Sequence, residues 1–170
     1  MKSFLSDAIS RAGAQGGDLG PTYSNEYSSA DQELVRILES LKTNIKIIGC
    51  GGGGTNTIDR LSEVGIMGAE IYAANTDAQH LLAVRSPHKL LLGRRSTRGL
   101  GAGALPQVGE EAAREAEDEL RKILTGSDIV FVTAGMGGGT GTGSAPYVAK
   151  LAKDMGALTI AVVTYPFKAE

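Results

Sequence analysis

The sequence has few of the features that disulfide-bonded or membrane-spanning proteins depend on. Cysteine occurs once in 170 residues, at Cys50, so no disulfide can form within the chain, which fits a reducing compartment. No apolar run approaches the roughly 18 residues of a membrane span. The first ten residues, MKSFLSDAIS, lack the apolar segment of a signal peptide. We therefore expect a cytoplasmic protein without direct membrane contact.

An excess of charge of either sign is also missing. The chain has 17 Lys and Arg against 19 Asp and Glu, for a net charge of -2. This balance gives no electrostatic reason to bind nucleic acid. The apolar fraction of 42% and the charged fraction of 21% are typical of a globular domain with its own core. Cys50 ends an apolar run, IKIIGC, and is interpreted as a small core residue rather than a nucleophile.

Hydrophobic periodicity predicts an amino-terminal segment followed by alternating strands and helices. Residues 1–30 are rich in Ser and Gly and predict an extended or disordered leader. Residues 31–43 predict a helix that Asp31 can cap. Strands are predicted at residues 44–50, 69–75, 88–93, 128–135 and 157–166. Helices are predicted between them at residues 55–65, 77–84, 108–124 and 145–156, the last with Pro146 in its first turn. This alternation predicts an α/β fold, a doubly wound parallel sheet with helices on both faces.

Glycine is the residue in excess, and it is clustered. The chain has 24 glycines, about twice the usual share of roughly 7%. The clusters lie at residues 49–54, 99–103 and 135–143, each after a predicted strand. With strand order 3-2-1-4-5, strands one and four are neighbours where the chain reverses direction across the sheet, and ligands bind in the crevice there. The glycines therefore predict a ligand site at the carboxyl ends of the strands.

The glycine-rich stretch AGMGGGTGTGSAP, at residues 134–146, is typical of an anion-binding turn. Bare backbone lets a ligand approach closely, and successive N–H groups together with a following helix attract negative charge. Thr140 and Thr142 can each add a hydroxyl donor. The alternative is a turn that needs glycine for packing alone, which suits one or two glycines better than six. The stretch therefore predicts a phosphate cradle.

The glycine motifs alone do not decide which phosphate ligand binds. The run GCGGGG fits the dinucleotide pattern G-x-G-x-x-G at Gly49, Gly51 and Gly54, with Glu70 or Asp77 near the place of a ribose-binding acid. A nicotinamide-binding oxidoreductase domain is therefore one alternative. A Walker P-loop is excluded, because no lysine follows the glycines in the required spacing.

Several further motifs occur together in order: IGCGGGGTN, ANTDAQ, TRGLGAG, DIVFVTAGMGGGTGTG and AVVTYPF. In this combination the chain resembles the tubulin/FtsZ superfamily of GTPases from about residue 44 to residue 170, and archaeal members more than bacterial ones. The resemblance implies a Rossmann-like nucleotide-binding domain at residues 44–170, with GTP or GDP and Mg²⁺ as ligands.

The resemblance also implies roles for individual segments. Residues 52–56 would lie near the diphosphate, residues 102–104 would sense the γ-phosphate through backbone N–H groups, and residues 137–142 would hold the α- and β-phosphates. Asn75 and Asp77 would lie near the phosphates and Mg²⁺, which the phosphates themselves would hold, with no direct protein ligand. Pro166 and Glu170 would border the ribose. The implied nucleotide contacts are Gly52, Gly53, Gly54, Thr55, Asn56, Asn75, Asp77, Ala102, Gly103, Ala104, Gly137, Gly138, Gly139, Thr140, Gly141, Thr142, Pro166 and Glu170.

The sequence departs from the family pattern in two places. Leu105 stands where Asn usually precedes the proline, and Ala169 stands where an aromatic residue is common. The central helix and the catalytic loop of the family have no counterpart in residues 1–170. No catalytic residue is therefore expected within the chain, and an apolar strip should be exposed where the central helix would pack.

The resemblance predicts GTP hydrolysis and filament formation for the whole protein, and nucleotide binding for this chain. The whole protein would bind GTP, polymerise into filaments at the septal ring with adaptor proteins, and hydrolyse GTP at subunit junctions in service of cell division. This chain would be a fragment that binds nucleotide with weak or no turnover. A third hypothesis is a non-catalytic module that caps filament ends.

Overall fold

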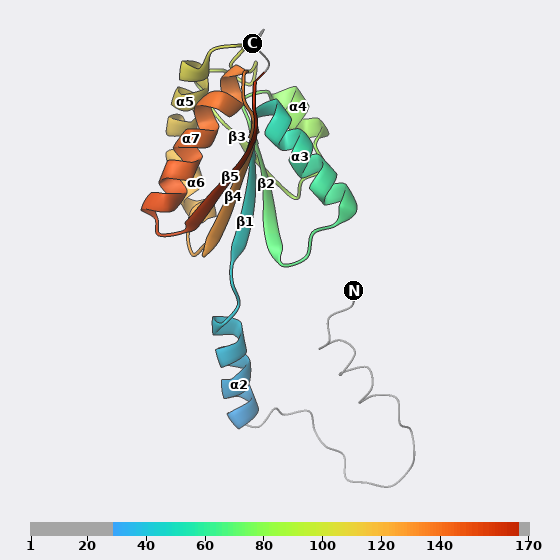
Figure 1. Cartoon of the computed structure of the whole chain (residues 1–170), viewed down its shortest axis with the longest axis vertical. Helices are drawn as coiled ribbons and strands as arrows, with labels where there is room; N and C mark the ends of the chain where they lie inside the picture. The colour runs from blue at the N-terminus through green and yellow to red at the C-terminus, as the bar shows by residue number, and fades with distance from the viewer. Residues whose placement is uncertain (1–28, 167–170) are drawn as a thin grey trace. The chain divides into compact units, whose positions relative to one another are not determined.

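The computed structural model describes residues 29–166, and the chain divides into two units, Met1–Lys42 and Thr43–Glu170 (Figure 1). The predicted leader lies almost wholly outside the described residues, as do Ala169 and Glu170. The described part of the first unit is mainly helix α2 (Ser29–Ser40), which starts and ends before the predicted bounds of 31 and 43. Its Leu34 and Ile37 side chains are exposed.

The second unit is built on one sheet of five parallel strands. These are β1 (Ile45–Cys50), β2 (Ala69–Asn75), β3 (His88–Leu91), β4 (Ile129–Gly135) and β5 (Leu158–Thr164). The strand order is β3-β2-β1-β4-β5 and every neighbouring pair is parallel. This confirms the predicted doubly wound order, so the carboxyl ends of the neighbouring strands β1 and β4 meet at one edge of the sheet.

Helices cover both faces of the sheet, as predicted. Helices α3 (Gly51–Val64) and α4 (Ala78–Ala83) lie on one side, while α5 (Pro106–Glu115), α6 (Glu117–Leu124) and α7 (Gly139–Asp154) lie on the other (Figure 1). The larger core cluster includes Leu120, Val130 and Val148 on the α5–α7 side. The smaller cluster centres on Ile58 and Leu81 on the α3–α4 side. Within residues 29–166, none of the helices is both long and apolar enough to cross a membrane.

The largest differences from the predicted helices lie at the starts of α3 and α7 and in the middle of the predicted helix 108–124. Helix α3 begins at Gly51 rather than residue 55, and α7 begins at Gly139 rather than residue 145, so the glycines form the first turns of both helices. Pro146 consequently lies inside α7 and not in its first turn. The predicted helix 108–124 is broken at Ala116, whose φ of -93° and ψ of 15° leave the helical region between α5 and α6.

Strand β5 leaves apolar side chains uncovered. Val162 is 57% exposed and Ile160 is 38% exposed. An apolar hollow of about 220 Å³ lies beside this strand, lined by Ile47, Leu61, Phe131 and Val162 among others. The second unit therefore has an exposed apolar strip of the kind expected from the sequence.

Candidate functional site

Two helix amino termini meet at the carboxyl edge of the sheet. Helix α3 begins at Gly51, directly after β1, and α7 begins at Gly139, shortly after β4. A Cβ atom on Gly51 would lie 2.5 Å from the backbone nitrogen of Gly141, and Gly51 has a φ of +69°. Only glycine allows both this backbone conformation and this approach. The two glycine clusters are thus held against each other.

The backbone at this junction has the properties of an anion site. Within the described chain, neither N-cap residue, Cys50 for α3 or Gly138 for α7, makes a side-chain hydrogen bond to its helix. The first N–H groups of a helix have no acceptor inside the helix, and the helix dipole places positive charge there. Gly52, Gly53 and Gly138 are exposed at this point. The Gly139 N–H of α7 donates to the Gly103 carbonyl, and the other first-turn N–H groups of the two helices lie in the same region without an acceptor inside their helix.

The predicted site glycines fall into two groups. Gly54, Gly139 and Gly141 are buried, whereas Gly52 and Gly53 are exposed and Gly137 is half-buried. A Cβ atom on Gly141 would lie 2.6 Å from the carbonyl oxygen of Gly135. The buried glycines therefore serve the packing role that was the alternative interpretation. Gly53 also packs closely, since a Cβ atom on it would lie 2.9 Å from the backbone nitrogen of Gly135, whereas Gly52 leaves backbone open to a ligand.

The threonine hydroxyls of the glycine stretch have partners within the chain. Thr140 Oγ1 lies 2.6 Å from Thr76 Oγ1. Thr142 Oγ1 accepts a hydrogen bond of 3.0 Å from the backbone N–H of Gly137. Because Thr142 acts here only as an acceptor, its own O–H remains able to donate. Thr76 is fully buried, and the sequence analysis missed it, although it stands between two predicted site residues.

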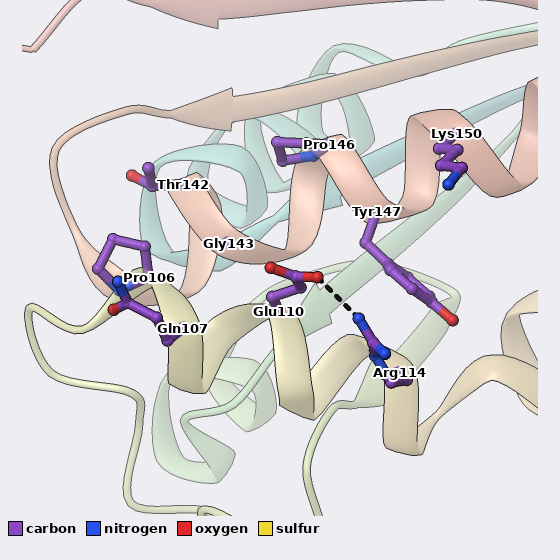
Figure 2. A pocket seen from close by; sticks show the side chains of 9 residues that line it. All are labelled: Pro106, Gln107, Glu110, Arg114, Thr142, Gly143, Pro146, Tyr147 and Lys150. Carbon is purple, nitrogen blue, oxygen red and sulfur yellow. Dashed lines mark hydrogen bonds and ion pairs between the residues drawn. The ribbon is translucent and has the colours of Figure 1, made fainter.

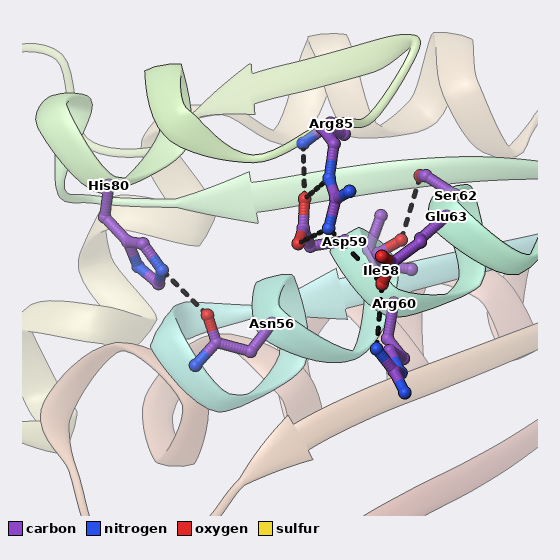
Figure 3. Close-up of polar contacts among 8 residues, drawn as sticks. All are labelled: Asn56, Ile58, Asp59, Arg60, Ser62, Glu63, His80 and Arg85. Carbon is purple, nitrogen blue, oxygen red and sulfur yellow. Dashed lines mark hydrogen bonds and ion pairs between the residues drawn. The ribbon is translucent and has the colours of Figure 1, made fainter.

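The end of β2 carries a polar chain that continues through His80 to α3, and Figure 3 shows its last contact, between His80 and Asn56. Asn75 Nδ2 lies 3.1 Å from His80 Nδ1, and His80 Nε2 lies 2.9 Å from Asn56 Oδ1. Asp77 accepts a 3.0 Å hydrogen bond from the backbone N–H of His80 and so caps α4. The structure brings Asn56 and Asn75 together as predicted site residues. The bridging residue, His80, was missed because no helical or strand periodicity marks it.

The third predicted loop packs against the start of α7. The carbonyl of Gly103 accepts a 2.9 Å hydrogen bond from the N–H of Gly139, and Gly101 N–H donates to the Thr76 carbonyl at 3.1 Å. Ala102 is buried, whereas Gly103 and Ala104 are exposed. The loop is therefore joined to both β2 and α7 at the site.

Leu105, one of the two departures from the family pattern, is the N-cap residue of α5. Its side chain is 59% exposed and makes no cap hydrogen bond. Asn is among the best N-cap residues because its side-chain oxygen accepts a helix N–H. The leucine thus leaves the start of α5 without the cap that the usual residue can supply.

The segment with Arg94, Arg95 and Arg98, which precedes the 99–105 loop, is held by the carboxylate of Glu115. The backbone N–H groups of Arg95 and Ser96 donate to the Glu115 carboxylate at 2.8 and 3.1 Å. These bonds hold the pKa of Glu115 below its usual range. Arg94 and Arg98 are exposed, and the chain around them is fixed by Glu115.

Helices α5 and α7 approach closely beside the site. A Cβ atom on Gly143 would overlap the carbonyl oxygen of Pro106. A groove of about 350 Å³ between the two helices is lined by residues that include Thr142, Tyr147 and Lys150, and the Glu110–Arg114 ion pair of 2.9 Å lies along it (Figure 2). Helix α7 is therefore held against α3 at Gly141 and against α5 at Gly143.

The remaining predicted residues lie at the margin of the site or outside it. Pro166 is half-buried and follows β5, and Glu170 lies outside the described residues. Cys50 is fully buried at the end of β1. Burial raises the pKa of its thiol to about 12, with a smaller opposing effect from a hydrogen bond with Ser144. At neutral pH this thiol is therefore protonated and unreactive.

Carboxylate and imidazole groups do not gather around the junction in numbers that suit a metal. Among the described residues, no three His, Cys, Asp or Glu side chains are placed to hold a metal ion. Asp77, the predicted site acid, uses its Oδ1 atom to accept the α4 cap hydrogen bond from the His80 N–H.

The fold and the site together define an α/β protein of the doubly wound class in which two helix amino termini meet at the switch point. A family model described as the GTPase domain of the Tubulin/FtsZ family matches residues 44–170. The chain belongs to the Tubulin/FtsZ family.

Individual relatives agree with this family. The chain is 55% identical over 170 residues to "Cell division protein FtsZ 1" of Archaeoglobus fulgidus, and this match covers 100% of the chain and 46% of that protein. It is also similar to the solved structure of the FtsZ W319Y mutant of M. jannaschii, with a TM-score of 0.76 and 54% identity over 82% of this chain and 42% of the other.

A more distant solved structure shows the same fold. It is CetZ2 from Haloferax volcanii, a GTPγS-bound protofilament, with a TM-score of 0.61 and 26% identity over 75% of this chain and 41% of that one. The chain spans less than half the length of the relatives and structures it matches.

Proposed function

We propose that this chain forms the GTP-binding part of a tubulin-like cell-division GTPase. The observation that carries the proposal is the junction of α3 and α7, where two helix amino termini without side-chain caps bring their first backbone N–H groups, other than that of Gly139, to one region. The match of the GTPase-domain family to residues 44–170 and the cell-division name of the A. fulgidus relative support it.

The phosphates of GTP or GDP would lie at this junction. Residues 137–142 would hold the α- and β-phosphates, residues 52–56 would lie near the diphosphate, and residues 102–104 would face the γ-phosphate. Asn75 and Asp77 would lie at the same edge, and Pro166 and Glu170 would border the ribose. Contacts among these three segments support this arrangement. Gly51 of α3 packs against Gly141 of α7, and the N–H of Gly139 in α7 donates a 2.9 Å hydrogen bond to Gly103 of the 99–105 loop.

The reaction of the whole protein would be transfer of the γ-phosphoryl group to water. Such a transfer depends mainly on positioning and on stabilisation of charge. Mg²⁺, when bound through the nucleotide phosphates, would neutralise part of that charge. The residues of this chain would hold and orient the phosphates through backbone donors, and the groups that activate water would come from outside residues 1–170.

The whole protein would self-associate into filaments and act at the septal ring in the cytoplasm with adaptor proteins. The GTPγS-bound protofilament of the CetZ2 relative supports the filament part of this proposal. The exposed apolar strip on β5, with Val162 at 57% exposure, would be covered by the central helix of the family.

Calorimetric titration tests the proposal. The purified chain is titrated with GTP, GDP and NAD in the presence of Mg²⁺. NAD is included because Gly49, Gly51 and Gly54 fit the dinucleotide pattern. We expect binding of GTP and GDP without binding of NAD. Binding of NAD alone would overturn the proposal. Failure of all three to bind a chain that circular dichroism shows to be folded would mean that the cradle is not sufficient for binding.

Hydrolysis is tested separately. We expect the chain to release phosphate from GTP far more slowly than an intact homologue, because the groups that activate water would be supplied by another part of the protein. Turnover at a rate equal to that of the intact homologue would contradict this expectation. Sedimentation of homologue filaments with and without the chain tests the capping hypothesis, which requires polymer mass or length to fall.

A further inference from the structure

The end of β2 fixes the orientation of one side-chain amide. Asn75 is 2% exposed, and its Oδ1 accepts hydrogen bonds from the backbone N–H groups of Thr76 at 2.9 Å and Asp77 at 3.4 Å. Rotating this amide by half a turn would place an NH₂ group against these backbone donors. Asn75 therefore keeps its Nδ2 directed at His80, 3.1 Å from Nδ1.

The fixed amide determines which nitrogen of His80 carries the proton. Asn75 Nδ2 is a donor only, so His80 Nδ1 has to accept. The neutral imidazole then carries its proton on Nε2, which donates to Asn56 Oδ1 at 2.9 Å. Cε1, between the two nitrogens, is the ring atom closest to Gly52, since a Cβ atom placed on that glycine would lie 3.7 Å away from it. The ring thus bridges β2 and α3 beside the exposed glycines.

The same chain of bonds fixes the orientation of Asn56. Its Oδ1 is engaged with His80, and its Nδ2 points away from the imidazole (Figure 3). Asn56 is exposed and lies two turns or less from the amino terminus of α3. It therefore presents a hydrogen-bond donor, not an acceptor, next to the free N–H groups of that helix.

We propose that His80 is a positioning residue for the nucleotide. Held as the Nε2–H tautomer between Asn75 and Asn56, it turns the Asn56 amide so that its N–H group donates to an acceptor oxygen of a bound nucleoside diphosphate. This inference rests on the proposed function for the identity of the ligand. The direction of the relay, from Asn75 through His80 to Asn56, rests on the hydrogen bonds alone.

The first test determines the tautomer of the His80 imidazole by NMR, without any ligand. The chain contains two histidines, His80 and His88, so ¹⁵N-labelled histidine gives two imidazole spin systems, and His88→Gln assigns them. We expect long-range ¹H–¹⁵N correlations of His80 to show a protonated Nε2 and an unprotonated Nδ1. A His80 ring protonated on Nδ1 instead would overturn the relay, whatever the chain binds.

The second test reads the effect on the ligand through a double-mutant cycle. GDP affinity is measured by calorimetry for the parent, His80→Ala, Asn56→Ala and the double variant. We expect His80→Ala to weaken GDP binding about fivefold, the effect of one lost hydrogen bond. In the Asn56→Ala background the same change should have no effect. An equal loss in both backgrounds would show that His80 does not act through Asn56.

Two further variants separate positioning from packing. His80→Gln keeps an amide that can accept from Asn75 and donate to Asn56, so it should restore affinity to within about twofold of the parent. His88→Gln removes a histidine that stacks on Tyr72 with ring centroids 4.8 Å apart, and it should leave GDP affinity unchanged. A His80→Gln variant as weak as His80→Ala, with unchanged unfolding free energy, would contradict the proposal. Failure of the parent to bind GDP would instead count against the proposed function, and the tautomer would still test the relay.

Discussion

The hydroxyl groups of Thr76 and Thr140 lie 2.6 Å apart, although the two residues are 64 positions apart in the sequence. Thr76 is fully buried after β2, and Thr140 is the second residue of α7. The Thr76 carbonyl also accepts a 3.1 Å hydrogen bond from the N–H of Gly101. Thr76 therefore joins the first turn of α7 to the end of β2 and to the 99–105 loop.

This hydroxyl pair should show coupled effects on stability. Thr76→Val and Thr140→Val each keep the side-chain shape but leave the partner hydroxyl unpaired, which should lower the free energy of unfolding by about 1 kcal/mol. The double variant removes both polar groups and should lose less than the sum of the two single changes. Urea unfolding of the four proteins measures this coupling, and strictly additive losses would contradict it.

Gly51→Ala should be among the most destabilising single methyl additions in the chain. The φ of +69° is unfavourable for alanine, and the new Cβ atom would lie 2.5 Å from the backbone nitrogen of Gly141. Gly68→Ala is the matched control, because Gly68 has a φ of +84° with open space around it. We expect about 1–2 kcal/mol for the control and a clearly larger loss for Gly51→Ala in urea unfolding. Equal losses would show that the two helix termini can move apart without cost.

The sheet was predictable from the sequence because local patterns determine it. Apolar runs separated by helical periodicity predicted all five strands, and the order expected for a doubly wound sheet, 3-2-1-4-5, is the order observed. The helix starts were not predictable, since glycine has a low helix propensity. Gly51 and Gly139 nevertheless begin helices at places where tertiary contacts leave no room for a side chain: Gly51 packs against the first turn of α7, and Gly139 packs against the 99–105 loop.

The break at Ala116 had only a weak signal in the sequence. Gly109 is the only glycine in the run from residue 108 to residue 124, which has no proline, and it stands near the start of the run rather than at the break. Three consecutive acids, Glu117, Asp118 and Glu119, form the first turn of α6, and acidic residues favour helix starts. At the site, the motifs predicted Asn56 and Asn75, but the bridge through His80 depends on how β2, α3 and α4 pack and could not be read from spacing.

Cys50 should be inert in the folded chain. Its thiol is fully buried, and burial raises its pKa to about 12. Because the thiolate is the reactive form, a disulfide reagent at pH 8 should label the native chain very slowly and the urea-unfolded chain at the rate of a free thiol. The unfolded sample is the control for reagent quality. Rapid labelling under native conditions would mean that the end of β1 opens readily.

The Asp59–Arg85 pair connects α3 to the segment after α4 (Figure 3). The Arg85 backbone N–H and Nε donate to Asp59 Oδ1 at 2.7 and 3.0 Å, and its terminal nitrogen donates to Oδ2 at 2.8 Å. The side-chain hydrogen bonds from Arg85 are the main cause that holds the pKa of Asp59 well below its usual range. Since the folded pKa is lower than the unfolded one, the pair stabilises the fold above the unfolded pKa of about 3.9 and loses this effect as the pH falls below it.

Asp59→Asn should therefore lower the melting temperature at pH 7, and the difference from the parent should narrow as the pH is lowered from about 5 towards 2. Thermal unfolding followed by circular dichroism at several pH values measures the difference. Glu110→Gln is the control, because Glu110 forms an exposed single contact with Arg114 four residues later in the same helix, and such pairs contribute little. A difference between Asp59→Asn and the parent that stays constant across this pH range would show that the carboxylate charge is not what Arg85 stabilises. In that case the backbone hydrogen bond from Arg85, which the asparagine oxygen can also accept, would be the contact that holds the two segments together.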